Sequence, residues 1–299
     1  MHVILYSRPL ISSTIKRGRN WLRPAIVILS LLGLFTSWVS GQGSADHYQE
    51  RISTLFTSIT SSGSDVGRDK LADTLSLVVE QYLSEGFPFE HKFEGVKYIG
   101  QLFTDDSLVK ALSWNIAFLD GTNRYTCFIV SKEGSGTRVL HLDSSEGLAA
   151  VSADSLINSE KWYGALYYDI IPFTSGDRSF YILLGFDMNG MFTNSKVIDI
   201  LWFGDAGAAG FGAPLIRSGN TVRHRLIFNY SSEVSMMLRA DKEKNRIIFD
   251  HLSPADPGFT GVYQYYGPDS SYDALELRDG IWWLVEDIDL RNREEGKKK

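Results

Sequence analysis

The residues best suited to chemistry lie near the C-terminus, where acidic and aromatic side chains are concentrated. The stretch 249–273, FDHLSPADPGFTGVYQYYGPDSSYD, is followed by IWWLVEDIDLRN at 281–292. Carboxylates beside aromatic rings are typical of glycan sites, because the acids transfer protons or attack the sugar while a ring stacks on it. The candidate catalytic residues are Asp250, His251, Asp269, Asp273, Asp287 and Asp289, and the candidate stacking rings are Tyr265, Tyr266, Trp282 and Trp283.

The same composition is also what turns between strands require. In RIIFDHL, alternation places Asp250 and His251 on opposite faces of a strand, so these two side chains cannot pair with each other. Prolines in PADPG and YYGPDSSYD restrict φ, glycines permit reversals, and aspartates accept hydrogen bonds from nearby amides. Alternation along IWWLVEDIDL places Trp283, Asp287 and Asp289 on one face of another strand. We expect these segments mainly to bend and cap a sheet, with a ligand site as the alternative.

Other motifs for nucleotide, metal or nucleophilic chemistry are incomplete. The glycines of LWFGDAGAAGFGAP (201–214) lack the spacing and the following helix of a dinucleotide loop, so a flexible loop or surface bulge is expected. Asp187 and Asn189 are spaced loosely as in a calcium loop, but the closing acidic ligand is absent and Asn189-Gly190 favours a hairpin turn. G-x-S-x-G and H-E-x-x-H sequences do not occur. We expect no cofactor and no metal, although scattered histidines leave zinc open.

Charge and cysteine content exclude further classes. Of 30 basic residues, five precede residue 42 whereas none of the 36 acidic residues does, so the remainder is strongly acidic. Such a surface repels phosphate backbones, and nucleic acid is therefore not an expected partner. An envelope component or a glycan is the partner class that remains. The single Cys127, inside RYTCFIV, permits no intramolecular disulfide and is expected to be a buried core thiol.

The first 41 residues have the form of a secretory signal peptide. A basic stretch precedes an apolar run of 15 residues from Ala25 to Val39, which is shorter than the roughly 20 residues of a membrane-spanning helix. We expect cleavage before Gln42, with an uncleaved anchor as the alternative. Because no cysteine lies near this position, the exported chain is not expected to be a lipoprotein. The expected locations are the periplasm, the outer-membrane surface and the extracellular space, with a mature chain that does not span a membrane.

A pair of helices is expected in residues 42–88, followed by a β domain in 89–292 and a disordered tail in 293–299. The apolar residues Ile52, Phe56 and Ile59 recur at helical spacing. After the turn SSGSD, Ser64 or Asp65 can cap a second helix, which Gly86 ends. The simplest role of this helical pair is to cover one open face or edge of the β domain.

The β domain is expected to be a mostly antiparallel meander of about ten strands, closed, sandwiched or propeller-like. Apolar residues occupy both odd and even positions in SFYILLGF and KVIDILWF, as in strands that are buried on two faces. Five turn signals mark hairpins because aspartate, asparagine and glycine tolerate positive φ. They are Asp120-Gly121, the GSG at 134–136, TSGDR at 174–178, DKEKN at 241–245 and Asp279-Gly280.

Six sequence segments, taken together, resemble those of a known group of proteins. They are KWYGALYYDIIP (161–172), YILLGFDMNG (181–190), NSKVIDIL (194–201), FDHLSP (249–254), YYGPDSSYDAL (265–275) and DIDLRN (287–292). Over roughly residues 90–292 the chain resembles a family of uncharacterised exported proteins of Bacteroidota-type Gram-negative bacteria. Phe186 stands where that family has tryptophan, which is a mild departure. The resemblance implies an envelope or secreted location and brings no activity, ligand or catalytic residue.

These observations favour an exported, non-catalytic β-rich protein with a structural or binding role in the cell envelope. The reason is that every nucleophile and metal motif tested is incomplete despite the length of the chain. One alternative is a hydrolase that acts on envelope glycans or peptides through the C-terminal carboxylates. The other is a carbohydrate- or peptide-binding module that uses the candidate rings.

Overall fold

The computed structural model describes residues 36–134, 136–144, 156–158, 161–188, 190–204 and 209–290. Contacts divide the chain into two units, Met1–Gln42 and Gly43–Lys299. Most of the expected signal peptide lies outside the described residues, and helix α1 (Thr36–Ser61) covers the expected cleavage position. No helix in the described part of the chain is both long and apolar enough to cross a membrane.

Two helices precede the sheets, as the sequence predicts. Helix α2 (Asp65–Ser84) begins after Ser64, whose hydroxyl accepts a hydrogen bond from the Gly67 amide at 3.1 Å. This bond satisfies one of the amides that a helix leaves free at its first turn. Gly86 follows the helix with φ of 76°, a left-handed conformation that suits glycine. The predicted cap and the predicted end of α2 are both confirmed.

Three sheets follow the helices. The first has the order β1-β2-β3-β4, and its strands are β1 (Gly100–Phe103), β2 (Val109–Ala117), β3 (Asn123–Glu133) and β4 (Gly136–Asp143). The second has the order β5-β9-β8-β7-β6 with β12 also on β8; its strands are β5 (Ile157–Asn158), β6 (Leu166–Ser175), β7 (Arg178–Asp187), β8 (Thr193–Phe203), β9 (Ala209–Phe211) and β12 (Leu226–Ser231). The third has the order β11-β10-β16-β15-β14-β13; its strands are β10 (Ile216–Ser218), β11 (Thr221–Arg223), β13 (Leu238–Asp241), β14 (Arg246–Pro254), β15 (Tyr266–Arg278) and β16 (Ile281–Val285).

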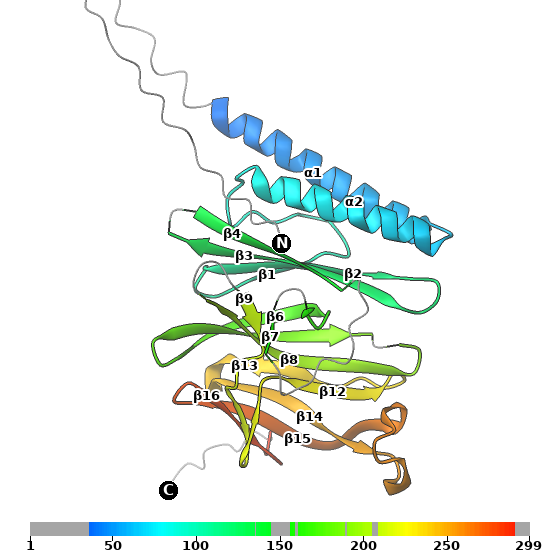
Figure 1. Ribbon diagram of the computed structural model, residues 1–299, viewed down its shortest axis with the longest axis vertical. Coiled ribbons are helices and arrows are strands. Elements are labelled where there is room, and N and C mark those ends of the chain that lie inside the picture. The colour runs from blue at the N-terminus through cyan, green and yellow to red at the C-terminus, as the bar shows by residue number, and fades with distance from the viewer. Residues whose placement is uncertain are drawn as a thin grey trace, which may run out of the picture. The chain divides into compact units, whose positions relative to one another are not determined.

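Within residues 43–290 these elements are sandwiched in layers, with apolar clusters between them (Figure 1). Ile52 of α1 and Val79 of α2 pack with Trp114 of β2 against one face of the first sheet. The other face of this sheet packs on the second sheet, whose opposite face packs on the third. In β7, Leu183 lies in the cluster toward the first sheet and Ile182 in the cluster toward the third. The predicted burial of β7 on both faces is thus confirmed.

The fold class is confirmed as mainly β with an N-terminal helical pair, and of the three forms expected it is the sandwiched one. All five predicted turns join paired neighbouring strands; Asp279 and Gly280 between β15 and β16, for example, have φ of 51° and 77°. The structure describes sixteen strands rather than about ten. Strands β10 and β11 have three residues each, which is too short for an alternation of apolar and polar residues to be recognised. The expectation of a simple meander is wrong, because β10 pairs in parallel with β16 and β12 pairs with β8.

The glycine-rich stretch departs from the expected loop or surface bulge. Ala209–Phe211 form β9, which pairs with both β5 and β8. A Cβ atom on Gly210 would lie 2.4 Å from ring carbons of Trp202, so the missing side chain makes room for that ring. The expectation is therefore wrong for Gly210, and residues 205–208 lie outside the described part.

One buried arginine joins the helical layer to the first sheet. Arg124 on β3 has a side chain that is only 8% exposed, and its guanidinium contacts three carboxylates. They are Asp69 and Asp73 on α2, at 2.7 and 2.8 Å, and Asp143 at the end of β4, at 2.6 Å. Because one guanidinium carries five donors in a rigid fork, it can bridge two elements at once.

Replacement of Arg124 by methionine should destabilise the protein. It removes the ion pairs of Arg124 with Asp69, Asp73 and Asp143 and so weakens the attachment of α2 to the sheet. We expect the free energy of unfolding to fall by about 2–3 kcal/mol, less than for a fully buried pair. Urea denaturation followed by circular dichroism measures this. The matched control is Arg138→Met, which removes the more exposed ion pair with Glu133 and should cost less than about 1 kcal/mol. Equal losses in the two variants would contradict the bridging role.

Candidate functional site

The C-terminal candidates meet at an irregularity between β14 and β15. Asp250 lies opposite Tyr272 and Leu252 lies opposite Pro268, so residues 269–271 of β15 face His251 alone. Ser270 has a left-handed φ of 74° within this bulge. The bulge interrupts the alternation along β14, and the side chain of His251 is accordingly 43% exposed rather than buried with the core of that strand.

His251 is paired with Asp273 from the neighbouring strand. Its Nδ1 atom lies 2.8 Å from Oδ2 of Asp273, and the other oxygen of this carboxylate accepts a hydrogen bond from the Asp287 amide at 3.0 Å. The hydrogen bond to Asp273 raises the pKa of His251, burial opposes the rise, and the nearby Asp269 and Glu286 add to it. The positive form of the imidazole is therefore favoured, and the carboxylate holds the ring in one orientation.

The other acidic candidates on these two strands accept hydrogen bonds from backbone amides. Oδ2 of Asp250 accepts from the Met237 amide at 2.7 Å, so Asp250 and His251 contact different partners, as alternation predicts. Oδ1 of Asp269 accepts from both the hydroxyl and the amide of Ser271, at 2.7 and 3.0 Å. These hydrogen bonds, the hydroxyl first, hold the pKa of Asp269 below its usual value. Asp269 therefore caps its local turn, whereas Asp250 holds the backbone just before β13.

The expected strand that carries Asp287 and Asp289 is wrong beyond Val285, where β16 ends. Asp287 has φ of 55°, which is incompatible with a continuing strand, and the Ile288 amide donates to the Tyr272 carbonyl at 2.7 Å. The chain thus continues alongside β15, past an irregularity at Asp287. Residues 270–272 and 287–290 line a recess of about 390 Å³ beside the Asp273 carboxylate.

The candidate rings divide into buried and exposed ones. Trp282 is 2% exposed and packs edge-on against Phe173, which corrects the expectation that it offers a face to a ligand. Trp283 is 37% exposed. The hydroxyl of Tyr266 accepts a hydrogen bond from the Gly261 amide at 3.0 Å, whereas Tyr265 leaves 43% of its surface free.

Further exposed apolar side chains surround Tyr265. They belong to residues 255–266, which we call the aromatic loop and which contain the short 3₁₀ helices η4 (Pro257–Phe259) and η5 (Tyr263–Tyr265). The rings of Phe259 and Tyr265 stack at 4.2 Å between centroids. Exposed members of the loop, besides Tyr265, are Phe259, Val262 and Tyr263.

Of the two candidate metal ligands, the structure describes Asp187. Asp187 accepts a hydrogen bond from the Tyr163 hydroxyl at 3.2 Å, and burial raises the pKa of its carboxyl group. Asn189 lies outside the described residues. Among the residues that the structure describes, no group of three or more histidine, cysteine or acidic side chains could hold a metal ion. Cys127 is buried in the core as predicted, and burial raises the pKa of its thiol.

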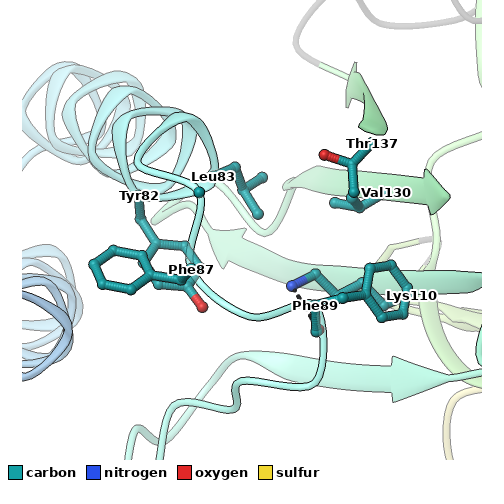
Figure 2. Close-up of a pocket in the computed structure, with 8 residues that line it drawn as sticks. Tyr82, Leu83, Phe87, Phe89, Lys110, Val130 and Thr137 are labelled. Atoms are coloured by element: carbon teal, nitrogen blue, oxygen red, sulfur yellow. Dashed lines mark hydrogen bonds between the residues drawn. The ribbon is translucent and has the colours of Figure 1, made fainter. Parts of the chain in front are cut away.

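A second site, around Lys110, was missed in the sequence. Lys110 on β2 is only 3% exposed, and its Nζ donates to the Phe89 carbonyl at 3.0 Å. It borders a cavity of about 40 Å³ between α2, the loop that follows it, Val130 of β3 and Thr137 of β4 (Figure 2). Burial lowers the pKa of the Lys110 amine to about 8. The available signal was parity, because Lys110 shares the face of the core residues Leu112 and Trp114.

The His251–Asp273 pair should make stability depend on pH. Because the folded-state pKa of His251 is raised, its contribution is complete below the unfolded pKa of about 6.5 and is lost as the pH rises through the folded-state value. Since the ring is partly exposed, we expect a loss of less than about 1 kcal/mol. An NMR titration of the His251 ring checks this, and Asp273→Asn should lower its midpoint. An unchanged midpoint would contradict the pairing.

Comparisons of this chain with protein-family models, with curated proteins and with solved structures gave no match. A function must therefore be argued from the geometry of the chain itself.

Proposed function

We propose that this chain is a non-catalytic binding protein exported to the cell envelope, and that the aromatic loop contacts its ligand. The observation that carries the proposal is the exposure of the stacked pair Phe259 and Tyr265 on this loop. Aromatic rings bury large apolar areas when they find a partner, and a cluster of exposed rings is characteristic of a contact surface. Export rests on the signal-like leader and on the family resemblance.

The aromatic loop is held in shape before any ligand arrives. The Asp256 side chain caps η4 by accepting from the Gly258 amide at 2.8 Å. Backbone hydrogen bonds then follow at every third residue, from Phe259 to Asp256, from Val262 to Phe259 and from Tyr265 to Val262. A contact surface that is already ordered loses little conformational entropy on binding.

The charge of the aromatic loop favours an uncharged ligand. Asp256 is the single ionisable acid in residues 255–266, and no lysine, arginine or histidine lies among them. The Asp256 carboxylate is already a hydrogen-bond acceptor within the loop. A neutral carbohydrate fits this surface, because a pyranose face stacks on an aromatic ring without needing an opposite charge.

Tyr265→Ala should weaken carbohydrate binding. Loss of the exposed ring and of its stacking on Phe259 should lower the affinity about tenfold, as for an aromatic contact of roughly 1–1.5 kcal/mol. Isothermal titration calorimetry with neutral oligosaccharides and soluble peptidoglycan fragments measures this. The control is Tyr98→Asn, which removes another exposed tyrosine at a left-handed position that asparagine tolerates. Equal affinities of the wild type and Tyr265→Ala would refute the proposed surface.

Hydrolysis of envelope glycans or peptides is the second candidate function, and the His251–Asp273 pair favours it. A carboxylate on Nδ1 is the arrangement that orients a catalytic histidine, and the recess lies beside the same carboxylate. However, Asp269 caps the Ser271 backbone, and Asp273 already accepts from two donors.

If the chain is a binding protein, the purified wild type should release no product from peptidoglycan or from peptide substrates. Chromatography of the soluble fraction tests this. Product formation that disappears in folded Asp273→Asn and persists in Asp105→Asn, a change at an exposed surface ion pair, would replace the binding function with the hydrolytic one.

A further inference from the structure

The cavity beside Lys110 contains an uncommon combination of a buried amine and an apolar wall. An ammonium group has three hydrogens to donate. The described residues offer the Lys110 amine one acceptor, the Phe89 carbonyl at 3.0 Å, and place it 5.1 Å from the centre of the Phe89 ring. A buried charge is costly unless it is paired, so this amine would gain from an anion that occupies the cavity.

The surroundings of Lys110 are rich in positive charge. Lys132 lies 4.5 Å from the centre of the same Phe89 ring, and Lys92 lies 4.8 Å from that of the adjoining Phe103. The carboxylate in this group is Glu90, which is 3.0 Å from Lys132 and is therefore already paired. Three ammonium groups thus gather around two rings, with Glu90 as their counter-charge.

The lining of the cavity restricts the size and chemistry of an occupant. Figure 2 shows the Lys110 amine and the Thr137 hydroxyl both directed toward the side of the cavity that Leu83 occupies. Phe87 and Val130 complete an apolar wall. A buried water molecule needs about 10–15 Å³. The cavity of about 40 Å³ therefore admits an occupant of roughly three heavy atoms. Thr137 is itself exposed, so the cavity can be reached from solvent.

We propose that this cavity is a binding site for one small monovalent carboxylate, of which formate is the simplest. The Lys110 ammonium donates to one carboxylate oxygen and the Thr137 hydroxyl to the other, while the apolar wall contacts the C–H side. This site is separate from the aromatic loop and does not depend on the proposed carbohydrate binding. The small volume of the cavity favours formate over larger carboxylates.

Binding of the carboxylate should be coupled to protonation of Lys110. The groups that face the amine are Tyr82 from α2, Glu90 and His91 from the following loop, and Lys132 from β3. Burial lowers the pKa of His91, which keeps that imidazole neutral near pH 7. With an amine pKa of about 8 in the free protein, the protonated fraction falls about tenfold between pH 7 and pH 9.

Titration calorimetry of the full chain with sodium formate, at constant ionic strength, tests the site. We expect saturable binding at pH 7 and about tenfold weaker binding at pH 9. Lys110→Met should abolish binding and Thr137→Val should weaken it at least about fivefold, the loss of one hydrogen bond to a charged group. The matched control Lys242→Met should bind formate within about twofold of the wild type, since this exposed lysine is paired with Asp105 and does not line the cavity.

Each other outcome would overturn the assignment. Absence of saturable heat at pH 7 would mean that water alone fills the cavity. Equal affinity for chloride and formate would remove the carboxylate specificity. If Lys110→Met does not fold, two other results still test the site: the pH dependence of the wild type and the affinity of Thr137→Val. Formate affinity that changes neither with pH nor with the Thr137→Val substitution would show that formate binds elsewhere.

Discussion

Burial of two sheets on both faces is the constraint on which the rest of the structure depends. Strands β7 and β8 carry apolar side chains toward the first sheet and toward the third, so a charge between these layers must be paired. Asp199 and Arg225 are both fully buried, with Nε of Arg225 3.2 Å from Oδ2 of Asp199, and the Ile200 amide donates to the other oxygen at 2.8 Å. The pair thereby ties the start of β12 to β8, since either charge alone would be costly there.

Because the layers are apolar, the candidate functional residues lie where strand pairing is irregular or where a loop meets the layers. His251 lies at a bulge in the outermost sheet, the aromatic loop interrupts the path from β14 to β15, and Lys110 lies near the start of β2 beside the loop that follows α2. His251 and the aromatic loop are held by a few local hydrogen bonds, whereas Lys110 is held in a regular ladder between β1 and β3 and is covered by the loop around Phe89. Side chains can vary there without disturbing the three apolar clusters.

The parts of the fold that were predictable are those determined by local sequence. The helical stripe that contains Ile52 and Phe56, the Ser64 cap and the hairpin at Asp279-Gly280 depend on residues close in the chain, and all three are confirmed. Short strands were missed because three residues cannot establish a period. The environment of Lys110 was missed for a related reason. A lysine is normally expected to face solvent. Lys110 is buried because the chain around Phe89, which is distant in sequence, folds over it.

The C-terminal cluster illustrates why residue types alone do not distinguish binding from catalysis. Asp250 and Asp269 accept hydrogen bonds from backbone amides, which restrict the motion of both carboxylates. For Asp269 the hydrogen bonds from Ser271 also lower the pKa and so favour the ionised form. A general acid must instead hold a proton near neutral pH and reach the substrate. The exposed Phe259 and Tyr265 rings are different, because their apolar surface gains nothing from water and their stacking leaves part of it free. Asp250 and Asp269 thus have a structural explanation within the chain, whereas the exposed rings have none there and are the surface on which the proposed binding function rests.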